Sequence, residues 1–331
     1  MNADDAASQT YRARIAAGEA AERAGDLLTA AAAYRDAAES AVPEHAAEGH
    51  FRLGVVEWRR SRFDEALAEF AATRETAQRL GRQDLVARAW NGEGTIHCQR
   101  GEFQQARAAY QVAMDATEDP VLHGRSLQNL GVLANIEGNL GEALQQYARA
   151  RRAFRDHGDH ASEALVLHNM GMLHADRMEW DEADDSYSLA LALFEADGNQ
   201  PMIANTLANR SEVLSARGQF SEAAQHCVMA LSIYTELGDD VGRGETLRWH
   251  GRALRGARDF AGAETVLAQA IQIAGHYRIK LLEAEVSREL YELTRELHRD
   301  AEAATWRARA LSLFEELGAT REINALQADR G

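Results

Sequence analysis

Twelve histidines and two cysteines are the side chains of this 331-residue chain that could hold a metal ion or act as nucleophiles. Glu93 and His97 stand four residues apart, on one face of a helix, whereas His168 and His174 stand six apart and point to different faces. The metal motifs HExxH and CxxC do not occur, and the cysteines Cys98 and Cys227 match no metal or redox spacing. The sequence therefore predicts no metal site and no cofactor.

Sequence contexts that would mark an enzyme are also missing. No serine or cysteine stands in a nucleophile-elbow motif. The glycine-rich stretches Asn91–Gly94 and Gly242–Gly244 lead into helices, whereas a phosphate-binding loop follows a strand. An enzyme or metalloprotein that uses a groove as its pocket is therefore the least favoured hypothesis, and we expect no catalytic residues.

Arginines are the side chains with the clearest capacity to bind. Arg248, Arg252 and Arg255 follow one another at i, i+4 and i+7 on one helical face, with Trp249 beside them. Like charges at this spacing are mildly destabilising, and a carboxylate or phosphate held by the guanidinium groups would relieve them. This triplet is therefore a candidate contact for an anionic partner.

These side chains are placed by a repeating pattern whose period settles to 40 residues. Its anchor is an alanine, a second small residue follows seven positions later, and an aromatic column lies between them. A further column of small residues precedes the anchor by twelve positions. The anchors are Ala30, Ala66, Ala106, Ala143, Ala183, Ala223, Ala263 and Ala303. The preceding small column is Gly18, Gly54, Gly94, Gly131, Gly171, Ser211 and Gly251, then Tyr291; the aromatic column begins Tyr34, Phe70, Tyr110, Tyr147 and Tyr187, then loosens to Cys227, Leu267 and Arg307.

Each column predicts a local structure. Glycine within a helix costs roughly 1 kcal/mol relative to alanine, so its recurrence indicates a close helix contact that a side chain would block. Glycines five residues before several anchors, such as Gly25 and Gly101, permit the positive φ with which a helix ends. Every unit therefore reads as helix A, a turn and helix B, and a period of this length predicts an all-α solenoid of stacked helical hairpins.

The columns resemble the tetratricopeptide repeat, with Trp90 at the family's helix A tryptophan, four residues before Gly94. The period exceeds the family's usual length of about 34 residues, so the chain is similar to the longer-helix subclass of kinesin light chains, polarity scaffolds and bacterial quorum-peptide receptors. The resemblance implies a right-handed superhelical solenoid of about eight repeats, in which A helices line a concave groove. It also implies a protein or peptide partner and no catalysis by the repeats.

An asparagine ladder is the main groove candidate that the resemblance implies. Asn129, Asn169 and Asn209 stand two residues before the small column in three successive repeats. A groove-facing amide pairs with both the N–H and the C=O of an extended peptide. The alternative is that these amides cap helices or bond between repeats. Other side chains expected to face inward are Arg88, Asn91, Arg125 and His168, with Trp58 among them.

The arginine triplet also has an alternative role. Glu212 and Glu292 occupy the position of Arg252 in the two flanking repeats, so stacking would set them beside it as a neutralising ladder. We favour this ion-pair role for Arg252 and leave Arg248 and Arg255 as open candidates. The clamp that other members of the family use for a carboxylate tail needs lysines that this chain lacks.

Composition narrows the partners further. The formal net charge is −16, and an acidic surface repels phosphate backbones, so we expect no nucleic-acid partner. The N-terminus has no apolar stretch, and no run approaches the ~18 apolar residues of a membrane span, which predicts a cytoplasmic protein. We expect a polar tail over residues 1–9, one solenoid domain over 10–318, and a capping helix and tail over 319–331; a homo-oligomer is possible but unassigned.

The favoured function is accordingly a non-catalytic binding module or scaffold that holds an extended segment in its groove, and the inward-facing arginines favour an acidic segment over a basic one. The alternative is a ligand-responsive regulator that senses a small signalling peptide.

Overall fold

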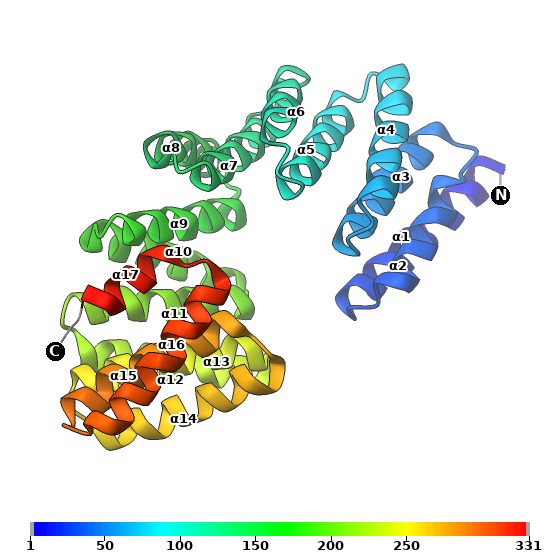
Figure 1. Ribbon diagram of the computed structural model, residues 1–331. Helices are drawn as coiled ribbons and strands as arrows, with labels where there is room; N and C mark the ends of the chain where they lie inside the picture. Colours follow the sequence, from blue (N-terminus) through cyan, green and yellow to red (C-terminus); the bar gives the residue numbers. More distant parts are fainter. Residues whose placement is uncertain (1–2, 329–331) are drawn as a thin grey trace. The chain divides into compact units, whose positions relative to one another are not determined.

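The computed structural model describes residues 3–328, and this part of the chain forms seventeen α-helices and no strand (Figure 1). The helices are α1 (Ala3–Arg23), α2 (Leu27–Ala38), α3 (Pro43–Arg59), α4 (Phe63–Leu80), α5 (Gln83–Gln99), α6 (Phe103–Asp115), α7 (Pro120–Ile136), α8 (Leu140–Asp156), α9 (His160–Asp176), α10 (Trp180–Asp197), α11 (Gln200–Ala216), α12 (Phe220–Leu237), α13 (Asp240–Gly256), α14 (Phe260–Tyr277), α15 (Lys280–Glu296), α16 (Asp300–Leu317) and α17 (Thr320–Ala328). The all-α class predicted from the period is confirmed. None of the described helices combines the length and apolar composition of a membrane-spanning segment.

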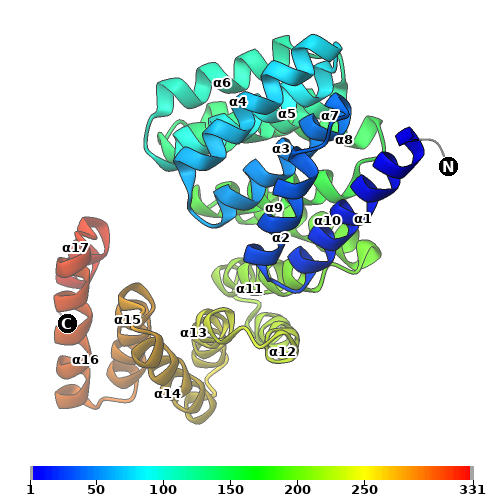
Figure 2. The ribbon, with the colours of Figure 1, turned by 90° about the vertical axis from the view of Figure 1, so that its right-hand side faces the viewer.

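The chain gathers its internal contacts into two compact units, residues 1–166 and 167–331, whose boundary falls within α9. Within each unit, odd-numbered helices are the A helices and even-numbered helices the B helices of successive hairpins. Figure 2 shows α11, α13, α15 and α17 of the second unit following one another as neighbouring A helices. The extent of a single solenoid domain over residues 10–318 stays a prediction.

The first five hairpins close where an A-helix glycine meets a B-helix ring. A Cβ atom built on Gly54 would lie 2.7 Å from the ring of Phe70, and one on Gly171 would lie 2.7 Å from that of Tyr187. No side chain fits at such distances, which explains why glycine recurs there. The anchor alanines behind the rings are at most 5% exposed. The spacing of the two columns therefore comes from one packing contact, repeated along the chain.

The turn between the A and B helices has a positive φ in all eight hairpins of the described chain. Four have glycine there: Gly25, Gly101, Gly138 and Gly218, with φ from 74° to 78°. The other four are Ser61, Met178, Arg258 and His298, with φ from 57° to 67°. The left-handed conformation is thus imposed by the hairpin, whatever residue occupies the position.

The two ends of the chain differ from each other in how they match the sequence prediction. Helix α1 begins at Ala3, so residues 3–9 of the predicted polar tail are helical; the alanine-rich sequence of α1 has a high helix propensity. Helix α17 lies within the segment where a capping helix was expected. Residues 1–2 and 329–331, the rest of the two predicted tails, lie outside the described residues.

Candidate binding site

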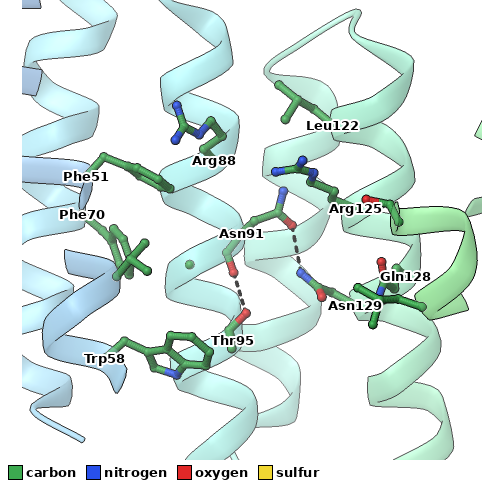
Figure 3. Close-up of a pocket in the computed structure, with 14 residues that line it drawn as sticks. Phe51, Trp58, Phe70, Arg88, Asn91, Thr95, Leu122, Arg125, Gln128 and Asn129 are labelled. Atoms are coloured by element: carbon green, nitrogen blue, oxygen red, sulfur yellow. Dashed lines mark hydrogen bonds between the residues drawn. The ribbon is translucent and has the colours of Figure 1, made fainter. Parts of the chain in front are cut away.

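A pocket of about 390 Å³ lies along the A helices of the first unit (Figure 3). It is lined by Phe51, Val55 and Trp58 of α3, Phe70 of α4, Arg88, Asn91, Gly92 and Thr95 of α5, Leu122, Arg125, Gln128 and Asn129 of α7, and Ser162 and Leu165 of α9. Four of the residues that the sequence predicted to face inward, Arg88, Asn91, Arg125 and Asn129, are therefore brought together. The described residues that line it include no aspartate or glutamate.

A hydrogen-bond network fixes the orientation of Asn91. Its side-chain oxygen Oδ1 accepts from Ser126 Oγ at 3.1 Å and from Asn129 Nδ2 at 3.4 Å. Thr95 Oγ1 donates to the backbone oxygen of Asn91 at 3.0 Å. Because both donors to Oδ1 come from α7, the amide nitrogen of Asn91 points to the side of the pocket where Arg88 and Arg125 lie (Figure 3). Asn91 therefore offers the pocket a donor.

The two arginines of the pocket differ in freedom. The guanidinium of Arg88 lies 4.0 Å from the centre of the Phe51 ring, and its Nη1 lies 3.2 Å from Glu48 Oε2. Arg125 is 53% exposed, and Asp159 Oδ2 approaches its Nη2 only to 4.0 Å. Arg88 is thus held in place, while Arg125 can reach toward a ligand.

An apolar surface completes the pocket. Phe51 and Trp58 lie on α3, and Trp58 Nε1 donates to Gln99 Oε1 at 2.8 Å, which fixes the indole. Leu122 is buried, whereas Leu165 is 36% exposed. The sequence reading missed Phe51, Leu122 and Leu165. The period could have found Phe51, since it precedes Asn91 by 40 residues and so shares its position in the A helix.

His168 and Asn209 form a corresponding network in the second unit. Thr206 Oγ1 donates to Met202 O at 2.7 Å, so His168 Nδ1 donates to Thr206 Oγ1, at 3.0 Å. His168 Nε2 then accepts from Asn209 Nδ2 at 3.5 Å. Burial lowers the pKa of His168 to about 4, so the imidazole is neutral at pH 7.

This network corrects the expectation for His168. The imidazole is only 4% exposed, because it packs against Tyr187, whose ring centre lies 5.6 Å away. Asn129 and Asn209 each donate their amide to the preceding A helix, which is the inter-repeat role left open as the alternative. Asn169 is partly exposed on α9.

The arginine triplet of α13 is partly neutralised within the second unit. Arg255 forms ion pairs with Glu289, at 3.3 Å, and with Glu296. Arg248 is only 6% exposed, with its guanidinium 3.6 Å from the centre of the Trp249 ring and its Nε 3.2 Å from Glu285 Oε2. Arg248 and Trp249 therefore cover each other instead of presenting open contacts.

Arg252 behaves differently from its two neighbours. It lines a cavity of about 410 Å³ together with Glu212 and Glu292, as the repeat spacing predicted. Even so, it forms no ion pair within 4 Å among the described residues. Burial raises the pKa of Glu212, while Arg248 and Arg252 act in the opposite direction. In the part of the chain that the structure describes, no group of three or more His, Cys, Asp or Glu could hold a metal ion.

Comparisons with known proteins agree with this architecture. The sequence profile of the tetratricopeptide repeat matches residues 45–119 and 162–236. No curated protein sequence matched the chain. Solved structures with the same fold include BtubC (BKLC) from P. vanneervenii, at 22% identity over 64% of this chain and 91% of that one, with a TM-score of 0.58. A Rap protein complexed with Competence and Sporulation Factor matches at 12% identity over 98% and 96% of the two chains, with a TM-score of 0.61.

A third structure, a STAND protein with a tetratricopeptide repeat sensor from Pyrococcus horikoshii, matches at 12% identity with a TM-score of 0.73, over 91% of this chain and 47% of that one. At these identities the likeness shows the fold alone. The matched profile, together with the glycine, alanine and aromatic columns, shows tetratricopeptide repeats over residues 45–119 and 162–236.

Proposed function

We propose that this protein is a non-catalytic peptide-binding module whose first-unit pocket holds an extended segment of a partner, with a carboxylate beside an apolar side chain. The observation that carries the proposal is the composition of the pocket wall. Arg88, Arg125 and the amide nitrogen of Asn91 are donors, and the described lining residues include no carboxylate.

A carboxylate suits this wall for a physical reason. It accepts hydrogen bonds only, and the planar guanidinium of arginine matches its geometry, so each such bond is worth roughly 1.5–3 kcal/mol. Phe51, Trp58 and Leu165 lie beside the donors and would cover an apolar side chain of the same segment. The volume of about 390 Å³ is enough for two or three side chains rather than for a folded domain.

The family also supports a peptide ligand, since tetratricopeptide-repeat proteins generally bind proteins or peptides. A second candidate function, a regulator that responds to a small signalling peptide, is supported by the Rap protein whose structure includes such a factor. Small-angle scattering with and without bound peptide separates the two candidates. A rigid binding module keeps its radius of gyration, whereas a regulator of this kind changes it.

The test of the proposed function begins with a peptide selected from a random display library against the intact chain. Its affinity is measured by fluorescence anisotropy for the wild type and for Arg88→Gln with Arg125→Gln. We expect the double variant to bind at least about tenfold more weakly, because it loses two charged donors.

The control is Arg149→Gln with Arg152→Gln, which removes the same charge from α8 and leaves the first-unit pocket intact. Equal affinities for the two double variants would refute the assignment of this pocket. Circular dichroism checks that both variants keep their helical content.

A further inference from the structure

The second unit contains its own polar cavity, of about 410 Å³, which is lined by residues of four A helices. Figure 2 shows these four helices, α11, α13, α15 and α17, as neighbours. The cavity is lined by Glu212 of α11, Arg252 and Arg255 of α13, Arg288, Glu289 and Glu292 of α15, and Arg321, Glu322 and Ala325 of α17. All of these residues belong to the second unit, so this cavity is separate from the peptide pocket proposed above.

The arginines of this cavity are unequally neutralised. Arg255 is paired with Glu289 and Glu296. Arg252, Arg288 and Arg321, from three different helices, form no ion pair within 4 Å among the described residues, although they line the same space. Three guanidinium groups that face one cavity repel one another, and a carboxylate of the protein or an added anion offsets that repulsion.

Two of the four carboxylates of the cavity form ion pairs with arginines other than these three. Glu289 is 3% exposed and pairs with Arg255 at 3.3 Å, and Glu292 pairs with Arg295 at 2.9 Å. Glu212 is half-buried; burial raises its pKa, while Arg248 and Arg252 act in the opposite direction. Glu322 is the remaining carboxylate in the lining. Four arginines and four glutamates line the cavity, and among the described residues Arg252, Arg288 and Arg321 form no direct ion pair with those glutamates.

The position of Arg321 depends on how α17 is docked. Arg307 donates from Nη2 and Nε to the backbone oxygen of Leu326, at 2.7 and 3.2 Å, close to the C-terminal end of α17. A guanidinium at a helix C-terminus interacts favourably with the helix dipole. Leu326 itself is buried against α16. Arg321 is thus carried to the cavity by an anchored helix.

We infer that this cavity is an oxyanion site in which Arg252, Arg288 and Arg321 hold one phosphate or carboxylate group of a small ligand. Guanidinium groups recognise both groups by paired N–H donors, and the cavity volume lies in the range typical of small-molecule sites. The inference does not depend on the peptide pocket of the first unit.

Isothermal titration of the full chain with inorganic phosphate, and separately with succinate, tests the site at constant ionic strength. We expect saturable binding of at least one of these anions, and the tighter of the two identifies the chemistry of the ligand. Arg288→Gln should weaken that binding about tenfold, since it removes one charged donor. Arg258→Gln is the matched control, because it removes the same charge from a turn outside the cavity.

Glu212→Gln provides a test in the opposite direction. It removes a carboxylate that competes for the same arginines and keeps the size of the side chain, so we expect tighter anion binding. The site assignment is overturned if neither anion binds, if Arg258→Gln weakens binding as much as Arg288→Gln, or if Glu212→Gln weakens it.

Discussion

At the scale of single residues, polar side chains of neighbouring A helices form hydrogen bonds with one another. Asn91 and His168 occupy the same position in their repeats, and each accepts a hydrogen bond from the asparagine of the next A helix. A partner can therefore use only the hydrogen-bonding groups of each side chain that these contacts leave unoccupied. In the first unit that group is the Asn91 amide nitrogen beside two arginines.

The buried imidazole of His168 should make stability depend on pH. Its folded pKa of about 4 lies below the ordinary value of 6.5, so the unfolded chain binds a proton that the folded chain does not. Stability is then complete above pH 6.5 and is lost as the pH falls from 6.5 toward 4. Between pH 7.5 and 5 this loss is about 2 kcal/mol.

The variant His168→Asn copies the residue that the chain uses at Asn91. It should retain the hydrogen bond from Asn209 and lose much less stability on going from pH 7.5 to 5, as measured by urea denaturation at the two pH values. His157→Asn, at an exposed helix end, should keep the wild-type response. If His168→Asn and the wild type lose the same stability, protonation of this imidazole is not the cause.

The sequence predicted which polar residues share a register, but not how they pair. Position in the repeat placed Arg88, Asn91, Arg125 and Asn129 on one face, and the pocket contains all four. The burial of His168 was missed because it depends on Thr206 and Tyr187, which belong to other helices. The position of a residue in the repeat follows from the sequence, whereas its hydrogen-bond partners depend on which residues of other helices lie beside it.

At the scale of helices and turns, the hairpin contact links the residues of the two columns. The sixth repeat replaces the glycine and the ring with Ser211 and Cys227, a pair of small side chains. Gly171→Ser should cost about 1–3 kcal/mol, because its Cβ would lie 2.7 Å from the Tyr187 ring.

The double variant with Tyr187→Cys should cost clearly less than the sum of the two single variants, since the smaller side chain makes room for the serine. Denaturation of the four chains gives the interaction energy. Additive losses would mean that the glycine is needed for another reason.

The left-handed turn offers a stabilising substitution. Met178 is 61% exposed and has φ 59°, a conformation that costs a non-glycine residue about 1 kcal/mol or more. Met178→Gly should therefore raise the free energy of unfolding by up to about 1 kcal/mol, with little packing lost. The converse change, Gly218→Ala, should lower it by a similar amount. A destabilised Met178→Gly would show that the side chain contributes more than its backbone costs.

The helices and hairpins were more predictable from the sequence than the turns and the C-terminal docking contact. Helical periodicity and glycine spacing placed the hairpins, because each column reports one repeated contact. The positive φ of Ser61, Met178, Arg258 and His298 was not foreseen, because the hairpin imposes it on residues that do not favour it. Arg307 seemed to mark a decaying column, yet it anchors α17 through Leu326.

At the scale of the whole molecule, global charge and local charge differ in sign. The chain carries a net charge of −16, whereas the lining of the first-unit pocket has two arginines and no acidic residue among those described. Charges farther away than about 8–10 Å are screened at physiological salt. The proposed recognition of an acidic segment therefore depends on local donors rather than on long-range attraction.

The most direct test of the central claim, that this pocket reads a carboxylate, is a double-mutant cycle between Arg125 and an acidic residue of the selected peptide. Anisotropy gives the affinities of the acidic peptide and its amide counterpart for the wild type and for Arg125→Gln. We predict that the amide peptide binds the wild type about tenfold more weakly, and that this difference largely disappears in Arg125→Gln. An equal loss in both proteins, with no interaction energy between the two sites, would contradict the account.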